Sequence, residues 1–514
     1  MEFYQIIAGE ITEGRIRDKE SLQRRKLALA REFSLDHIPS DTEILQSGLV
    51  PEDKSHLLKI KPTRTISGVA VVAAMTSPEA CPHGRCIYCP GGPGNNSPQA
   101  YTGHEPAALR GRSNNYDPYS ITFNRLKQLE TIGHDTSKVD LIIMGGTFTA
   151  RPREYQEYFI KGCFDGMNGT VSSSLQESML RNETASRRCV GLTVETKPDW
   201  FFEREIDLAL GYGATKVELG VQILNERVLR INGRGHGIME IARSTSLSRD
   251  AGLKIVYHLM PGMYGTSDGD DLKSFRRMIS DKEFKPDMLK IYPTLVVKDT
   301  PLYRLWKAGK YVPMDTETAS ELIVGFMKEM PPWIRVQRMQ RDIPVKFIEA
   351  GVKRSDIHNI VDEKLRERGI KTWEIRTREI GKAASDNGKI ELVRREYEAS
   401  GGNEVFLSME NEEHIFGYLR LRKPSAAAHR HEIGGSAIVR EIKVVGEVVP
   451  VGMHSSDLWQ HRGMGRALLS YAEDIASKEW GMERLLVISG VGVREYFRKH
   501  GYERLGPYMG KSLC

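Results

Sequence analysis

The stretch CPHGRCIYCPGG, residues 81–92, holds Cys81, Cys86 and Cys89, three of the six cysteines in this 514-residue chain. Clustered thiolates of this kind commonly hold a metal. Zinc is one candidate, because His83 could complete a Cys3His set, but structural zinc sites usually draw a second ligand pair from roughly a dozen residues further along. An iron–sulfur cluster fits better, since a 4Fe–4S cluster takes one thiolate per iron. Three cysteines would leave one iron open to a small molecule.

A second candidate site lies near the C-terminus. Gln460, Gly463 and Gly465 form a Q-x-x-G-x-G pattern at the start of an apolar, helix-forming run, GMGRALLSYAEDIASKEWG. Glycines at a helix N-terminus let backbone N–H groups approach a phosphate, and the helix dipole favours the negative charge. Tyr496 follows in REYFRKHGY, where core packing is the alternative to a chemical role.

Alternating strands and helices are expected to position the cysteines. Residues 66–295 hold six short apolar runs separated by helix-length stretches, which predicts βα units and a parallel sheet shaped as a partial barrel. Polar residues and glycines follow these runs, at the edge where such sheets bind ligands. The candidates at this edge are Gly145, Gly146, Thr147, Glu195, Glu218, Gln222 and Lys290.

Three further segments complete the expected organisation. Residues 1–65 read as helical and basic, 296–390 as a basic connecting region, and 391–514 as a separate α/β domain built from strands, one long helix and a further strand. The chain carries 74 basic and 68 acidic residues, a net +6. The charge is concentrated in residues 15–31, 334–354 and 419–423, which could neutralise phosphates or form solvated helix faces.

The cysteine spacing resembles that of the radical S-adenosylmethionine (SAM) enzymes, although Cys-x4-Cys-x2-Cys is one residue longer than their commonest form. The resemblance implies a partial (βα)6 barrel and a 4Fe–4S cluster whose open iron chelates SAM. Gly145, Gly146 and Thr147 would then pack against the amino group of SAM. Glu195, Glu218 and Gln222 would meet its ribose or methionine part, with a salt bridge the alternative for each carboxylate.

The C-terminal pattern is similar to that of the GNAT acetyltransferases. This resemblance implies that Gln460, Gly463 and Gly465 hold the pyrophosphate of acetyl-CoA. It also implies that Tyr496 protonates the departing CoA thiolate. Residue 497 is Phe, where relatives can have a second tyrosine, so a mechanism that needs this second hydroxyl is not supported.

Both patterns in one chain resemble the catalytic-subunit family of the Elongator complex. The matching stretches run from about residue 62 to the C-terminus and include QAYTGHEPAALR, IIMGGTF, NGRGHG, LKIYPTLV, RTREIG and VISGVGVREYFRKHGY. The family implies addition of a carboxymethyl group, derived from acetyl-CoA, to the 5-carbon of the wobble uridine in a tRNA anticodon stem-loop. The basic segments would grip tRNA phosphates, and Lys290 would contact SAM or the acetyl group unless it is a surface lysine. The cysteine pair that some relatives carry near RTREIG is absent, so no zinc site is expected there.

Other interpretations remain open at this stage. A lysine acetyltransferase acting on protein, with a structural iron–sulfur cluster, would need a general base, for which Glu441 is the nearest candidate. An RNA-binding scaffold without chemistry would leave the cysteines and the glycines unexplained, and a methylthiolating enzyme would need a second cysteine cluster. No signal peptide or membrane-length apolar run is visible, so a cytoplasmic protein without membrane partners is expected. A homodimer and accessory subunits are both open.

Overall fold

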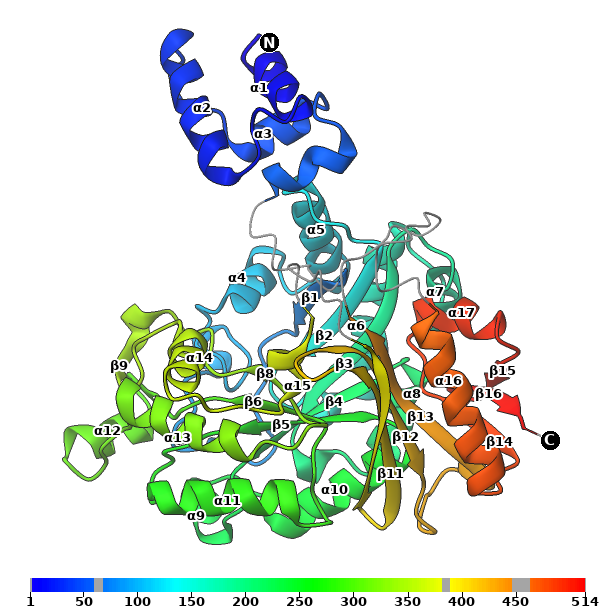
Figure 1. Cartoon of the computed structure of the whole chain (residues 1–514). Coiled ribbons are helices and arrows are strands. Elements are labelled where there is room, and N and C mark those ends of the chain that lie inside the picture. Colours follow the sequence, from blue (N-terminus) through cyan, green and yellow to red (C-terminus); the bar gives the residue numbers. More distant parts are fainter. Residues whose placement is uncertain (1, 60–67, 381–388, 446–462, 514) are drawn as a thin grey trace.

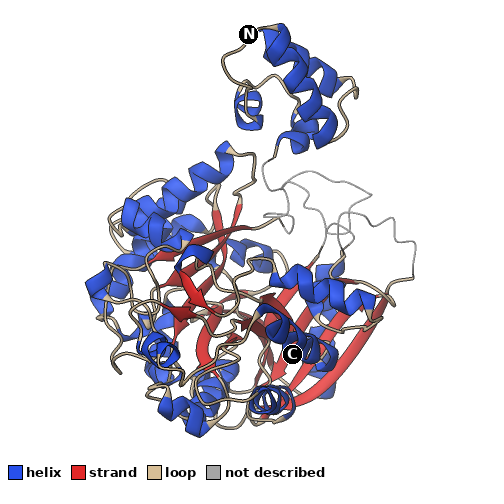
Figure 2. Ribbon diagram, turned by 90° about the vertical axis from the view of Figure 1, so that its left-hand side faces the viewer, coloured by secondary structure: helices blue, strands red, loops and turns tan. Residues whose placement is uncertain are grey.

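The computed structural model describes residues 2–59, 68–380, 389–445 and 463–513. Two seven-stranded sheets make up the main body, and a bundle of short helices at the N-terminus stands apart from it (Figures 1 and 2). None of the helices in these ranges is long and apolar enough to cross a membrane.

The first sheet is parallel throughout and runs in the order β1-β2-β3-β4-β5-β6-β8. The six expected apolar runs all form strands, and a seventh strand, β8, joins β6 from the basic region beyond residue 295. Each strand alternates its side chains between the helix layer and the inside of the curled sheet. The strands are β1 (Ala70–Met75), β2 (Lys138–Met144), β3 (Arg188–Thr196), β4 (Lys216–Gln222), β5 (Lys254–Leu259), β6 (Met288–Ile291) and β8 (Arg335–Arg338).

Helices connect these strands, and several start at recognisable caps. Asp117 accepts a hydrogen bond from the backbone of Ser120 at the start of α5, and Ser267 and Asp270 form a capping box on α11. The helices are α4 (Pro106–Ser113), α5 (Pro118–Thr131), α6 (Arg153–Asn168), α7 (Leu175–Asn182), α8 (Glu203–Gly211), α9 (Glu226–Ile231), α10 (Ile238–Asp250), α11 (Asp268–Ser280), α12 (Pro301–Lys307), α13 (Thr316–Glu329), α14 (Ile357–Glu367) and α15 (Ile375–Arg378). A small two-stranded sheet pairs β7 (Val296–Val297) with β9 (Ile348–Ala350).

The second sheet has the order β10-β11-β12-β13-β14-β16-β15 and is antiparallel except between β13 and β14. A parallel pair needs a crossover connection, and α16 (Met464–Asp474) lies between these two strands in the chain and packs on β12 and β13. The strands are β10 (Glu391–Ala399), β11 (Gly402–Glu410), β12 (Ile415–Lys423), β13 (Ser436–Val444), β14 (Arg484–Val487), β15 (Glu503–Leu505) and β16 (Tyr508–Ser512), and α17 (Arg494–Arg498) precedes β15. The expected C-terminal α/β unit is therefore present.

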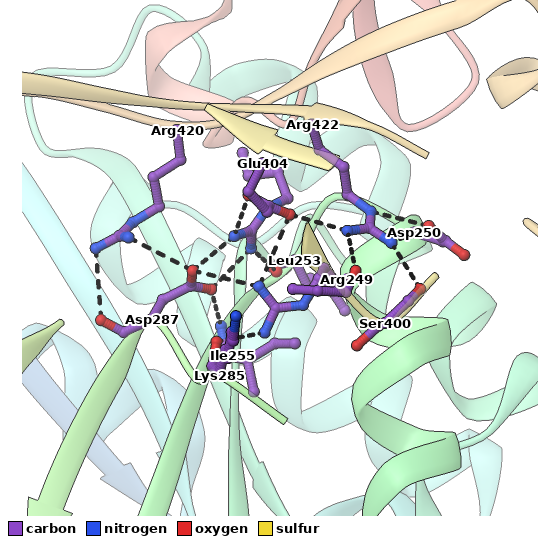
Figure 3. A network of polar contacts seen from close by, with 12 residues as sticks. Arg249, Asp250, Leu253, Ile255, Lys285, Asp287, Ser400, Glu404, Arg420 and Arg422 are labelled. Carbon is purple, nitrogen blue, oxygen red and sulfur yellow. Dashed lines mark hydrogen bonds and ion pairs between the residues drawn. The ribbon is translucent and has the colours of Figure 1, made fainter. Parts of the chain in front are cut away.

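A buried ionic network joins the two sheets (Figure 3). Asp287, at the start of β6, accepts two hydrogen bonds from Arg440 of β13, at 2.6 and 2.7 Å. Asp250, at the end of α10, accepts from Arg422 of β12 at 2.6 and 2.9 Å, and Glu404 of β11 contacts both arginines. All of these side chains are almost completely buried. The phosphate-binding prediction for residues 419–423 is therefore wrong for two of its three cations, because Arg420 and Arg422 are both sealed in this interface.

The N-terminal bundle consists of α1 (Glu2–Thr12), α2 (Lys19–Glu32), α3 (Asp41–Gln46) and a 3-10 turn, Glu52–Leu58, around its own small hydrophobic core. Its basic stretch is only partly available to a partner. Arg25 pairs with Glu10 at 2.8 Å, and the buried Lys26 pairs with Asp41 at 2.7 Å. The exposed cations of residues 15–31 are Arg15, Arg17, Lys19, Arg24 and Arg31.

Candidate functional site

One cavity of about 890 Å³ opens inside the curled parallel sheet. Its wall includes the cysteines of residues 81–89, alternate residues of β2 and β4, and basic residues of β8. Lys443 and Val445, in and just after β13, also line it, so the second sheet contributes directly to the wall. The carboxyl ends of the parallel strands meet here, as expected for the ligand-binding edge.

Cys81, Cys86 and Cys89 all line this cavity, in the loop that follows β1. Hydrogen-bond donors surround their sulfur atoms: the backbone N–H of Ala100 lies 3.1 Å from Cys89 Sγ, and a guanidinium nitrogen of Arg234 lies 3.4 Å from Cys86 Sγ. Such donors stabilise thiolate charge. The three sulfurs therefore form a set suited to ligating a cluster.

His83 lies inside the same loop. Its Nε2 is 3.2 Å from Cys86 Sγ, and burial lowers the pKa of the imidazole to about 4. The ring is thus neutral at neutral pH. This contact alone does not separate a zinc set from an iron–sulfur set.

The glycine-rich turn after β2 packs tightly beside the cysteines. Gly145 has φ +152°, and a Cβ there would lie 1.8 Å from Thr76 Oγ1. Gly146 has φ +84°, and its Cβ would lie 2.8 Å from the carbonyl oxygen of Gln99. Thr147 Oγ1 is 3.6 Å from Cys81 Sγ. Only glycine fits both positions, because the left-handed backbone and the close approach each exclude a side chain.

Two carboxylates and a lysine meet on the inner surface of the sheet. Glu195 and Glu218 are direct neighbours across β3 and β4, and Lys290 of β6 forms an ion pair with Glu218 Oε2. His258 of β5 reaches the same oxygen from its Nε2 at 2.8 Å. Lys290 is 9% exposed, so it is not a surface lysine. Glu218 occupies the interior of its strand, not the strand end that was predicted.

Charge sets the protonation of this group. Burial, reinforced by the neighbouring Glu218, raises the pKa of Glu195. Burial acts in the same direction on Glu218, but Lys290 and His258 outweigh it and hold the pKa of Glu218 below its ordinary value. Glu195 also accepts a hydrogen bond from Tyr101 Oη at 2.5 Å. The pair therefore contains one firmly ionised carboxylate and one that takes up a proton more readily.

Positive charge gathers at the end of the cavity near the second sheet. Arg335, Arg338, Arg341, Arg376 and Lys443 line this part of the wall, where Asp342 and Glu379 are the carboxylates beside them. Arg341 donates to the carbonyl of Ala100 at 2.6 Å, which connects this basic wall to the cysteine loop. The excess of cations over carboxylates makes this wall suitable for anionic groups.

The predicted glycine-rich turn of the second domain begins α16. Gly463 has φ +74° and caps the helix, and a Cβ on Gly465 would lie 3.3 Å from Tyr496 Oη and 3.7 Å from Val444 Cγ2. The structure thus brings Gly465 and Tyr496 together, while Gln460 lies outside the described residues. Burial raises the pKa of Tyr496, although the side chain remains 37% exposed.

Phe497 points the other way, into the core of the second domain, and is 3% exposed. A hydroxyl at this position would be buried among apolar side chains. The phenylalanine is therefore explained by packing.

Sequence reasoning did not single out several residues of the cavity wall, among them Tyr101, Arg234, His258 and Tyr292. Tyr292 comes two residues after Lys290 and shares its face of the sheet, and His258 of β5 is paired with Lys290 across the strands. Strand alternation and pairing that start from Lys290 could therefore have found both. Tyr101 and Arg234 lie in loops, QAYTGHEP and NGRGHG, where no periodicity predicts the direction of a side chain.

Three known families match parts of this chain. Its residues 1–66 match the ELP3 N-terminal domain, 75–278 the Radical SAM superfamily and 286–367 the Radical SAM C-terminal domain. The second match includes all three cysteines and favours an iron–sulfur cluster over zinc, since radical SAM domains hold a 4Fe–4S cluster and SAM.

Relatives match over nearly the whole chain. The tRNA uridine(34) acetyltransferase of Methanocaldococcus jannaschii is 47% identical, over 99% of this chain and 96% of its own length. Elongator complex protein 3 of Homo sapiens is 40% identical, over 96% and 93%. The structure of Methanocaldococcus infernus Elp3 lacking residues 1–46 covers 87% of this chain and all of its own, with a TM-score of 0.77 and 43% identity. Joined with the cysteine-lined half-barrel and the second α/β domain, these matches show that the chain belongs to the Elongator complex protein 3 family, which includes the archaeal tRNA uridine(34) acetyltransferases.

Proposed function

We propose that this chain modifies the wobble uridine of tRNA, using SAM-derived radical chemistry and acetyl-CoA to place a carboxymethyl group on the 5-carbon of the base. The observation that carries the proposal is the shared cavity. Cys81, Cys86 and Cys89 line it together with Lys443 and Val445 of the second domain. Val444, between these two, lies beside Gly465, which supports a common space for groups bound by the two domains.

The residues present fit the cofactors that the family implies. Cys81, Cys86 and Cys89 would hold the 4Fe–4S cluster, and the tight turn after β2 brings Gly146 and Thr147 to the cavity wall beside it, where SAM would bind. When bound, this pair supplies one-electron chemistry: a 5′-deoxyadenosyl radical that removes hydrogen from an unactivated carbon, and an acceptor for the electron released at the end.

The acetyl methyl group loses one hydrogen atom and its carbon forms a bond to the 5-carbon of uridine. Loss of the proton at that carbon and of one electron restores the double bond of the ring. Water then cleaves the thioester, leaving carboxymethyluridine and free CoA. Tyr496 lies beside Gly465, and its raised pKa keeps the phenol protonated at neutral pH, so it can give its proton to the CoA thiolate.

The basic wall would receive the tRNA. Arg338, Arg341 and Arg376 face the cavity, and a single-stranded anticodon base can be turned out of its stack into such a pocket while cations hold the flanking phosphates. Burial and the neighbouring Arg335 lower the pKa of Arg376, an unfavourable crowding of cations that a phosphate would relieve. The exposed cations of the N-terminal bundle would bind further phosphates of the tRNA.

The protein lysine acetyltransferase alternative is less well supported. Its candidate base, Glu441, accepts a hydrogen bond from Arg420 at 2.8 Å. Burial would raise the pKa of Glu441, but Arg420 outweighs burial and lowers it. A carboxylate held in this ion pair is a poor acceptor for the proton of an amine.

The test uses full-length protein with the cluster reconstituted anaerobically and its iron quantified. SAM, acetyl-CoA, a low-potential reductant and unmodified tRNA are added, and digested tRNA is analysed by mass spectrometry for carboxymethyluridine. Product should require both small molecules and disappear in Cys86→Ala. Cys163→Ala is the matched control, since Cys163 lies in the hydrophobic core and does not line the cavity. Product from Cys86→Ala, or acetylated lysine peptides in place of modified tRNA, would contradict the proposal.

A further inference from the structure

The NGRGHG turn, residues 232–237, forms the support behind the cysteine loop. Its backbone carbonyl at Asn232 accepts from the N–H of Ile87 at 3.2 Å. Gly235 has φ +70°, and a Cβ there would lie 2.8 Å from His83 Cβ. The two loops therefore touch along their length, and the glycine is required by this approach.

Arg234 is the side chain that this turn directs at the cysteines. It is 6% exposed and makes two contacts through different nitrogens: one donates to the carbonyl of Gly220 in β4 at 2.6 Å, and the other lies 3.4 Å from Cys86 Sγ. Its Nε is buried without a partner. The contact with Gly220 fixes the guanidinium to the sheet, so its position beside the sulfur does not depend on the sulfur alone.

Asp199 is close enough to act on the charge of Arg234 but forms its direct contacts with other side chains. The nearby Lys197 has Asp199 at 3.1 Å, and His236 lies 3.6 Å from the same carboxyl group. In the described part of the chain no carboxylate forms an ion pair with Arg234, and its guanidinium lies instead 3.4 Å from the sulfur of Cys86. Burying a cation without a partner is costly, and the contact therefore indicates a function at the cysteines.

We propose that Arg234 raises the reduction potential of the iron–sulfur cluster by placing a positive charge and an N–H donor against the Cys86 sulfur. Reduction adds one negative charge to the cluster and its thiolates, and a fixed cation stabilises the reduced state more than the oxidised one. The donor acts in the same direction, because hydrogen bonds to ligating sulfur favour the electron-rich state. Arg234 is thus a positioning and tuning residue, and this inference rests on the cluster assignment made under the proposed function.

The experiment measures the midpoint potential of the cluster in anaerobically reconstituted full-length protein, without SAM, by redox titration followed by electron paramagnetic resonance. Arg234→Gln keeps an N–H donor and removes the charge, and Arg234→Lys restores the charge. The matched control is Arg230→Gln, the same change at an exposed position four residues earlier. At a fixed potential we expect the ratio of reduced to oxidised cluster to fall about tenfold in Arg234→Gln, equivalent to about 59 mV for one electron. Arg234→Lys should recover most of this change, and Arg230→Gln should match the wild type.

Each other outcome decides the question. Unchanged potentials in both Arg234 variants would overturn the proposal. If a separate binding measurement then showed weakened SAM binding, Arg234 would be assigned to SAM. A loss of iron in Arg234→Gln would assign it the role of holding the cysteine loop, which also overturns redox tuning. A lowered potential in Arg234→Lys equal to that of Arg234→Gln would show that charge is not the cause. Wild-type protein that takes up no iron would refute the cluster assignment itself, which is a separate failure.

Discussion

Replacing Lys290 with methionine removes the cation from the two buried carboxylates of the cavity and leaves a side chain of similar length. In the wild type Lys290 pairs with Glu218 Oε2, and His258 reaches the same oxygen at 2.8 Å. Without the lysine, Glu218 and Glu195 would share a buried site with little compensating charge, and Glu218 would take up a proton. The variant should therefore be destabilised in a pH-dependent manner.

The size of the effect follows from the cost of protonating a carboxyl group whose ordinary pKa is about 4.3. Holding it neutral costs about 4 kcal/mol at pH 7 and about 1 kcal/mol at pH 5. These values are the upper limits of the lost stability, because the protein can always remove the unpaired buried charge by protonating Glu218. In the wild type, the lowered pKa of Glu218 stabilises the fold at every pH above the pKa of this carboxyl group in the unfolded chain, and this stabilisation is lost only at acid pH. In Lys290→Met the loss instead grows as the pH rises from 5 to 7.

The assay compares thermal unfolding of cluster-loaded wild type, Lys290→Met and the double variant with Glu218→Gln at both pH values. For a cooperative unit of roughly 450 residues, an unfolding entropy of about 2 cal/mol/K per residue converts 4 kcal/mol into a Tm decrease of about 4 °C. The double variant should recover most of this decrease, because it removes the unpaired charge. Equal destabilisation at pH 5 and pH 7, or no recovery in the double variant, would refute the reasoning.

Three further predictions concern the two candidate sites and the frame around them. Gly145→Ala should weaken SAM binding at least tenfold in equilibrium dialysis, because its Cβ would meet Thr76 Oγ1 at 1.8 Å. The control Gly325→Ala, at a helical position with nothing within 4 Å, should bind SAM as the wild type does. Equal binding by both variants would show that the turn is not part of the SAM site. Tyr496→Phe should slow CoA release about 10²-fold or more if the phenol is the proton donor, and full activity in this variant would leave Tyr496 with a packing role. Burial raises the pKa of Asp271 to about 7, so the native state keeps a proton there that the unfolded state loses near pH 4, and the stability of the wild type falls as the pH rises between these values. The Tm of Asp271→Asn should therefore rise relative to that of the wild type from pH 5 to pH 8. A Tm difference that stays constant over this range would show that Asp271 titrates normally.

The strands of the parallel sheet, and the place of the cysteines after the first of them, could be read from the sequence because local patterns determine both. Apolar runs alternating with helix-length stretches predicted six strands, and the short sequence spacing of Cys81, Cys86 and Cys89 placed all three in one loop. The seventh strand, β8, was not recognised because Arg335 and Arg338 give it a basic composition that resembles a surface segment. These arginines instead face the cavity, which only the tertiary structure reveals.

Charged residues were the least predictable. Arg420 and Arg422 appear in the sequence as a cationic patch, yet each has one carboxylate partner more than 100 positions away, Asp287 for Arg420 and Asp250 for Arg422. Lys26, within the basic stretch 15–31, is likewise enclosed, with its ammonium beside Asp41. Ion pairs between distant segments leave no periodic trace, and the sequence therefore cannot distinguish a phosphate-binding cation from one that holds two domains together.

The buried network between the sheets limits how this chain can be divided or recombined. A fragment beginning at β10 would expose Arg422 and Arg440 without Asp250 and Asp287, and the remaining fragment would carry the complementary acidic face. Each half would then expose unpaired charges together with apolar side chains that are buried in the intact chain. One half could be exchanged for that of a distant relative only if the relative carried the matching charges at this interface, so the two halves are expected to be inherited as one unit.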